Sequence, residues 1–170
     1  MAYLAAAMLL WLQLPIGAGE QLSISLSAPA RDDTRRIDAT GPGPHFHAVV
    51  SSRSGSPLRI WDDTFSWGYY ALSLEVTDSK GQTSVIQKRE VAFTRNIPAF
   101  WKLQPGEQLA MDIHLGDSRK WEQPSNGASR GCAPVTIRVV YEVTPTAESA
   151  RYGVWTGRVA SPPKHVELCR

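Results

Sequence analysis

Apolar and polar residues alternate along much of the chain beyond residue 20. The first example is Q-L-S-I-S-L-S at residues 21–27, where leucine and isoleucine face one way and serine faces the other. A period of two with one polar side is typical of a strand in an antiparallel sheet that buries one face. The same period predicts strands over residues 45–51, 70–76, 108–115 and 134–143.

Shorter apolar runs bounded by Gly, Pro, Asp and Ser predict further strands. These cover residues 58–61, 84–88, 91–94, 154–161 and 165–170. Gly68 is expected at a bend that a side chain would obstruct, and Gly81 in a hairpin loop over 77–83. Residues 28–44 and 116–134 are polar and are predicted as loops, and residues 144–153 as one helical turn that ends at Gly153.

Together these elements give roughly eight short strands separated by turn signals and no long amphipathic helix beyond residue 20. This pattern predicts an all-β fold, an antiparallel β-sandwich of immunoglobulin-like type, with a small barrel as the alternative. The Cys…Trp…Cys spacing of antibody domains is missing. The length of 170 residues suits one domain with a sizeable core.

The first residues predict a targeting segment. Residues 3–14 are almost wholly apolar, Pro15 interrupts them, and Gly17-Ala18-Gly19 supplies small residues for cleavage. We therefore expect a signal peptide over 1–19 in the form of an apolar helix, and one β-sandwich domain over 20–170. An uncleaved membrane anchor and a buried helix are the alternatives, because no basic residue precedes the apolar run. The mature protein is expected to be secreted or periplasmic, without a transmembrane span.

Composition and charge exclude some functional classes. Charged residues make up 20% of the chain and apolar residues 42%, which is a globular composition. The net charge is +2, and the basic residues are scattered without a long run. A nucleic-acid-binding role is therefore not indicated.

Two cysteines, Cys132 and Cys169, suggest a disulfide. If the strand from residue 134 pairs antiparallel with the terminal strand, its start lies beside the end of the other strand. The two cysteines occupy those positions, so an oxidising compartment would allow them to form a bridge. Two free thiols are the alternative.

His45 and His47 are the candidate metal ligands. Residues at i and i+2 of a strand project to the same face, so H-F-H places two imidazoles side by side. Asp112, His114 and His165 are the candidates for further ligands. The alternative is two histidines that face solvent, and we expect no bound cofactor.

The other indications of a metal site or a catalytic site in the sequence are weak. Asp62 and Asp63 have the oxygen ligands that Ca²⁺ prefers, but without an acidic cluster they are better explained as turn residues that accept backbone N–H bonds. The chain has no G-x-S-x-G motif and no phosphate-binding glycine loop. We therefore expect a protein that is not an enzyme.

The aromatic residues exceed what a small core requires. Phe100, Trp101 and Leu103 are expected to plug one end of the core, as Trp67 and Trp155 are expected to fill its interior. Trp121 lies in the polar insertion and is the candidate for an exposed residue on a binding surface. The surplus aromatic residues fit two alternatives, a platform on which carbohydrates stack and a protein-binding patch.

Three stretches carry a resemblance that covers residues 45–168. They are W-D-D-T-F-S-W-G-Y-Y-A-L-S-L-E-V, R-N-I-P-A-F-W-K-L-Q-P-G-E-Q-L and Y-G-V-W-T-G-R-V-A-S. They resemble bacterial exported proteins with an immunoglobulin-like sandwich and no assigned activity. The L-x-P-G-E element followed by a strand is also similar to the intracellular proteinase inhibitor family. The resemblance implies a sandwich and an extracytoplasmic location, and no inhibitory loop can be assigned from it.

The sequence thus predicts a non-catalytic module that binds or scaffolds a protein or a cell-envelope component. Proteinase inhibition by a surface loop is one alternative. Metal binding at His45 and His47 is another.

Overall fold

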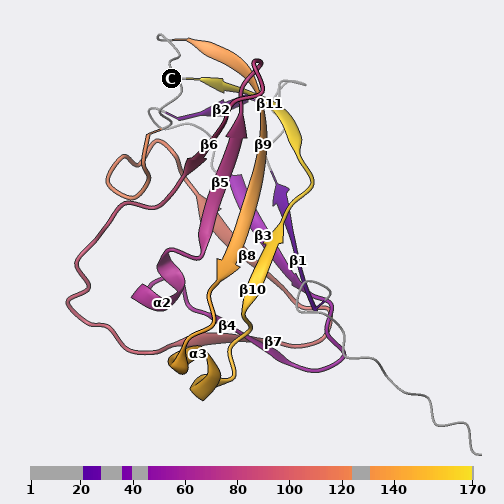
Figure 1. Ribbon diagram of the computed structural model, residues 1–170, viewed down its shortest axis with the longest axis vertical. Coiled ribbons are helices and arrows are strands. Elements are labelled where there is room, and N and C mark those ends of the chain that lie inside the picture. The colour runs from indigo at the N-terminus through magenta and orange to yellow at the C-terminus, as the bar shows by residue number, and fades with distance from the viewer. Residues whose placement is uncertain (1–20, 28–35, 40–45, 124–130, 170) are drawn as a thin grey trace, which may run out of the picture.

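The computed structural model describes residues 21–27, 36–39, 46–123 and 131–169, and it consists mostly of strands (Figure 1). The strands are β1 (Leu22–Ser27), β2 (Arg36–Asp38), β3 (Phe46–Ser52), β4 (Leu58–Trp61), β5 (Leu72–Thr77), β6 (Thr83–Ile86), β7 (Phe100–Leu103), β8 (Gln108–Ile113), β9 (Cys132–Val143), β10 (Gly157–Ala160) and β11 (Lys164–Cys169). The helices of this part are short: α2 (Ser66–Tyr69) and α3 (Ala147–Tyr152).

The strands form three sheets. One has the order β1-β3-β8, the second has the order β2-β11-β9-β5-β6, and the third pairs β4 with β7. β10 and β11 pair with successive halves of the long strand β9. Every pair is antiparallel except β2 with β11, which is parallel. The prediction of an all-β, largely antiparallel fold is confirmed.

One hydrophobic core joins the two larger sheets, which overlap in the view of Figure 1. Strand β1 shows the reason, because its leucines and isoleucine are buried while its serines point outward. Strands β3, β5, β8 and β9 bury alternate residues in the same way. Each fully buried aliphatic side chain contributes about 1.5–3 kcal/mol, so this alternation drives the two sheets together.

Strands β4 and β7 continue the β3–β8 pair beyond a break in each strand. Residues 53–57 separate β3 from β4, and residues 104–107 separate β7 from β8. In the second turn Gly106 has a φ of 80°, and the Glu107 carboxylate accepts a hydrogen bond from the backbone N–H of Gln104 at 2.7 Å. The β4–β7 pair therefore projects to one end of the molecule, the lower end in Figure 1.

Helix α2 replaces the simple bend predicted between β4 and β5. The Asp62 carboxylate accepts hydrogen bonds from the Thr64 amide at 2.9 Å and from its hydroxyl at 2.7 Å, which starts the turn. Gly68 then passes so close to this turn that a Cβ on it would lie 2.4 Å from the Asp62 carbonyl oxygen. The predicted need for glycine at position 68 and the turn role of Asp62 are both confirmed.

Replacing Gly68 with alanine is expected to lower the free energy of unfolding by about 3 kcal/mol or more, because the methyl group meets backbone and not a flexible side chain. Gly55 is the matched control, since a Cβ there would meet nothing within 4 Å. Urea denaturation of the Gly68→Ala and Gly55→Ala variants measures the difference. Equal stability of the two would contradict the described packing at α2.

Other sequence predictions have mixed outcomes. The helical turn before Gly153 is confirmed: Thr146 caps α3, and Gly153 has a φ of 61°. The predicted strand over 91–94 is wrong, because these residues make no ladder. The predicted loop over 28–44 contains β2, and the predicted connection before residue 104 contains β7.

The predicted signal peptide over 1–19 lies outside the described residues, so it stays a prediction. None of the helices in the described part is long and apolar enough to cross a membrane.

Candidate functional site

The lower end of the molecule in Figure 1 gathers β4, β7 and α3. Exposed and half-buried aromatic, apolar and basic side chains meet there. We call this set the β7 tip; it comprises Arg59, Ile97, Phe100, Trp101, Lys102, Arg151 and Tyr152. Two of the four large hydrophobic side chains exposed among the described residues, Ile97 and Trp101, belong to it.

An aromatic cluster holds α3 against β4 and β7. The Tyr152 ring lies 5.9 Å from the ring of the buried Trp61 and 6.3 Å from that of Phe100, measured between centroids. Trp67 packs on Trp61 from the side of α2 at 6.0 Å. Edge-to-face and tilted pairs at such distances are favourable, so the cluster fixes the position of the tip.

Two cations stand over these rings, and a third, Lys102, lies opposite one of them across the β4–β7 pair. The Arg59 guanidinium lies 4.6 Å from the Phe100 centroid, and its Nη1 donates to the Tyr152 carbonyl oxygen at 2.7 Å. The Arg151 guanidinium lies 5.5 Å from the Tyr152 centroid. Lys102 is the direct cross-strand partner of Arg59. Like charges placed opposite each other destabilise a sheet, so this pair is not explained by the folding of β4 with β7.

The charges of the tip differ from those on the outer face of the large sheet. There the Glu75 carboxylate binds both Arg138, at 2.5 Å, and Arg158, at 2.6 Å. Within the described part of the chain, none of the three tip cations forms an ion pair with a carboxylate. Their positive charge is therefore available to a partner.

Trp101 and Ile97 supply the apolar part of the tip. Trp101 is 46% exposed and Ile97 60% exposed. The prediction that Trp101 plugs the core is therefore wrong, although Leu103, two residues further along the same face of β7, is buried. Trp101 is exposed because β7 projects past the region where the larger sheets cover one another.

The prediction for Trp121 is also wrong. The sequence predicts it as an exposed residue on a binding surface, but only 2% of the residue is exposed. An isolated bridge pairs Trp121 with Lys88, which extends the edge of the sheet beyond β6. The polar residues around Trp121 in the sequence lie at the surface, while its ring joins the core.

Lys88 is buried beside Trp121 and is part of an internal polar cluster. Its Nζ lies 3.1 Å from the Asp63 carboxylate, 4.6 Å from the Tyr69 centroid and 5.9 Å from the Trp121 centroid. Burial, and then the nearby Tyr70 and Asp117, raise the pKa of Tyr69. Asp63 thus pairs with a lysine, which explains it as a structural residue. Calcium binding receives no support here, since the described residues contain no group of three possible metal ligands.

His47 lies on the exposed face of β3 opposite Asp112 on β8. Its Nδ1 is 2.8 Å from the Asp112 carboxylate. His45 lies outside the described residues, so the predicted pairing of the two imidazoles stays a prediction. Ser27 on β1 is the other cross-strand neighbour of His47. The described contacts include no Ser27–His47 hydrogen bond, the contact that would activate a serine nucleophile.

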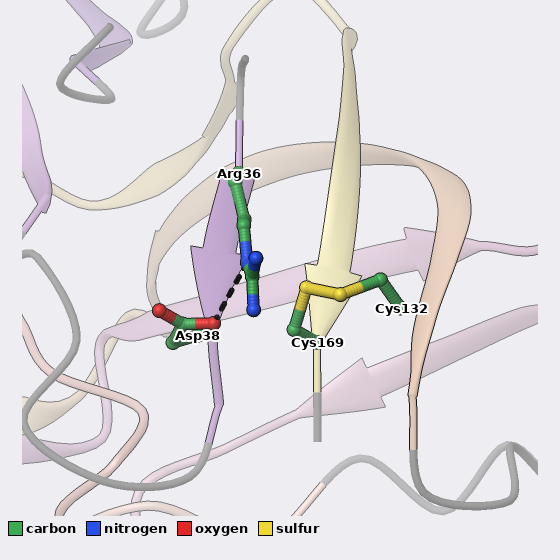
Figure 2. The surroundings of a disulfide bond; sticks show 4 residues. All are labelled: Arg36, Asp38, Cys132 and Cys169. Carbon is green, nitrogen blue, oxygen red and sulfur yellow. Dashed lines mark hydrogen bonds and ion pairs between the residues drawn. A yellow bond between two sulfur atoms is a disulfide. The ribbon is translucent and has the colours of Figure 1, made fainter. Parts of the chain in front are cut away.

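The disulfide is confirmed. Cys132 and Cys169 are direct partners in the β9–β11 ladder and are bonded, as Figure 2 shows. Strand β2 lies alongside, where the Ala39 amide donates to the Cys169 carbonyl oxygen at 2.8 Å. The bond therefore fastens β11, and through it β2, to the start of β9. A disulfide is consistent with an oxidising, extracytoplasmic location.

Comparisons with models of protein families, with curated proteins and with solved structures gave no match. The resemblance to exported immunoglobulin-like proteins therefore stays a prediction. The L-Q-P-G-E element that resembles proteinase inhibitors forms the turn between β7 and β8. Inhibition has no specific observation in its favour and also stays a prediction.

Proposed function

We propose that this chain is an exported, non-catalytic binding module with an immunoglobulin-like sandwich fold. In this proposal the β7 tip is the binding surface. The partner is a protein or another component of the cell envelope. The sandwich, the export and the tip each have separate support.

The strand order supports the immunoglobulin-like assignment. In that fold strands A, B and E share one sheet, and C, F and G share the other. Here β1, β3 and β8 form one sheet in the corresponding order. β5 and β9, with the interrupted strand β10–β11, match C, F and G, and β6 is an additional strand beside C. The agreement extends over both sheets, which favours a sandwich over a barrel.

Export is supported by two independent features. Residues 1–19 have the composition of a secretory signal. The disulfide joins residues 37 apart, an exposed Cys132 and a buried Cys169, and disulfides of this kind persist in oxidising compartments.

The observation that carries the binding function is the exposure of Trp101 and Ile97 beside the unneutralised pair Arg59 and Lys102. Aromatic residues and arginine dominate the energetics of protein interfaces, whereas scattered single apolar residues carry no such meaning. The sheet faces offer no comparable combination among the described residues.

The proposal is tested with a tip variant that carries Trp101→Ser and Lys102→Gln. A matched control carries Val85→Ser and Lys80→Gln, which change an exposed valine and an exposed lysine away from the tip. Immobilised wild-type chain is expected to retain a discrete component of an envelope extract at least ten times better than the tip variant, as expected for one interface hot spot. The control should retain it fully.

Equal retention by the tip variant would contradict the assignment of the surface. Circular dichroism melts of all three proteins show whether the substitutions leave the fold intact, as their exposure predicts.

Metal binding is the second candidate, favoured by the His47–Asp112 contact of 2.8 Å. A carboxylate that orients an imidazole through Nδ1 leaves Nε2 as the metal-binding nitrogen. If the site binds metal, adding Zn²⁺ or Cu²⁺ at 100 times the dissociation constant should stabilise the fold by about 2.7 kcal/mol. A thermal melt measures this shift, and His47→Ala should abolish it. An unchanged melt of the wild-type chain would eliminate this candidate.

A further inference from the structure

We propose that the β7 tip docks on the surface of an anionic lipid bilayer. This inference rests on the proposed function and names the partner chemistry of the same surface. It is carried by the charge of the tip, by the type of its exposed apolar residues and by the edge position of β7.

The charge of the tip is one-sided. Arg59 and Lys102 lie opposite each other, and Arg151 stands over Tyr152 on the adjoining helix. Residues 91–103, which lead into and form β7, contain Arg95 and Lys102 and no acidic residue. The acids beside the tip are Glu148 on α3 and Asp62, which follows β4 and accepts hydrogen bonds from Thr64. They number fewer than the basic residues Arg59, Lys102 and Arg151, so the tip keeps a net positive charge. Anionic headgroups attract such a cluster.

The exposed apolar residues are of the kind that enter the bilayer interface. Trp101 exposes an amphipathic ring that suits the headgroup region, and Ile97 exposes an aliphatic side chain of the same segment. Arg59 covers Phe100 at 4.6 Å, so this ring is not free to stack on a sugar. This arrangement favours partial insertion of the tip over a carbohydrate platform.

The edge position of β7 explains how the basic side chains and the exposed apolar side chains of the tip can contact the same partner. Trp101 and Lys102 are consecutive, so they leave the strand on opposite faces. Both are exposed, and the free edge of β7, which has no described strand on the side away from β4, lies between them. A partner that contacts both must approach along this edge and must be broad. A bilayer surface meets this requirement without a specific counterpart for each side chain.

The test measures partitioning of the full chain into vesicles by sedimentation. Vesicles of phosphatidylcholine alone are compared with vesicles that contain phosphatidylglycerol at low ionic strength. The wild-type chain is expected to prefer the anionic vesicles, and the preference should fall on adding salt. Arg59→Gln and Lys102→Gln together should reduce partitioning into anionic vesicles about 25-fold, since each basic residue contributes about fivefold.

A second variant, Ile97→Ser with Trp101→Ser, should weaken the same partitioning without removing the preference for anionic lipid. Val85→Ser with Lys80→Gln is the control and should behave as wild type. Residues 1–19 are present in every variant, so any contribution from that apolar segment is common to all of them.

Equal partitioning into both kinds of vesicle would overturn the inference, as would unchanged partitioning of the Arg59/Lys102 variant. If the chain does not partition into anionic vesicles but the tip still retains a protein from the envelope extract, the partner is an acidic protein surface and the proposed function stands. If the chain neither partitions into vesicles nor retains a component of the extract, the proposed function is contradicted together with the inference.

Discussion

Replacing Cys132 and Cys169 with serine is expected to lower the free energy of unfolding by about 4 kcal/mol. The bond closes a span of 37 residues, and opening it restores the conformational entropy of that span in the unfolded chain. Urea denaturation of the double variant beside the oxidised wild type measures the loss.

The location of the effect is as informative as its size. Because β2 pairs only with β11 among the described strands, loosening β11 should release both. Hydrogen exchange is expected to accelerate first in β2, in β11 and at the start of β9, while β5 keeps its protection. Wild-type chain treated with a thiol reductant should reproduce this pattern. A reduced chain as stable as the oxidised one would contradict the role given to the bond.

Replacing Trp121 with alanine is expected to cost about 3–5 kcal/mol, the usual range for a large aromatic residue removed from a core. The ring is nearly inaccessible, and its loss also removes one wall around the Lys88 ammonium. Lys88 would then keep its ion pair with Asp63 in a wetter and looser setting.

Trp101→Ala is the matched comparison, because it removes the same side chain from an exposed position. Its cost is expected to be below about 1 kcal/mol. Chemical denaturation of the two variants separates a structural tryptophan from one that is free to bind. Similar costs, or a larger cost at position 101, would contradict the burial assigned to each.

These two tryptophans also show how far the sequence alone reaches. Period-two patterns identified β1, β3, β5, β8 and β9, because each buries one face against the other sheet. The pairing of the terminal strand with β9 followed from the same logic and located both cysteines. The local sequence pattern is sufficient to predict a strand when the alternation of its own apolar and polar residues determines which of them are buried.

Local pattern fails where burial depends on distant segments. Trp121 has polar neighbours in the sequence, yet its bridge to Lys88 carries it into the core. Trp101 follows the apolar residues 99–100 and shares a face of the strand with the buried Leu103, yet β7 extends beyond the larger sheets. The residues next to each tryptophan in the sequence carry no information about these long-range contacts. The sequence therefore predicts an exposed Trp121 and a buried Trp101, the opposite of what the structure has.

The short elements were missed for a related reason. β2 has three residues, too few to show a period of two, and it pairs with β11 at the far end of the sequence. Helix α2 depends on Asp62 and Gly68 meeting across the turn, a contact that propensity does not describe. One signal for β7 was available, since F-W-K-L has the length and the residue types to pair with the predicted strand L-R-I-W.

Site-specific photocrosslinking tests the central claim most directly. A photoreactive phenylalanine analogue placed at position 101, or at the equally exposed position 85, is irradiated in cells that export the chain. Position 101 should yield a discrete protein or lipid adduct, identified by mass, and position 85 should yield none. Adducts absent from position 101, or the same at both positions, would contradict a binding surface at the β7 tip.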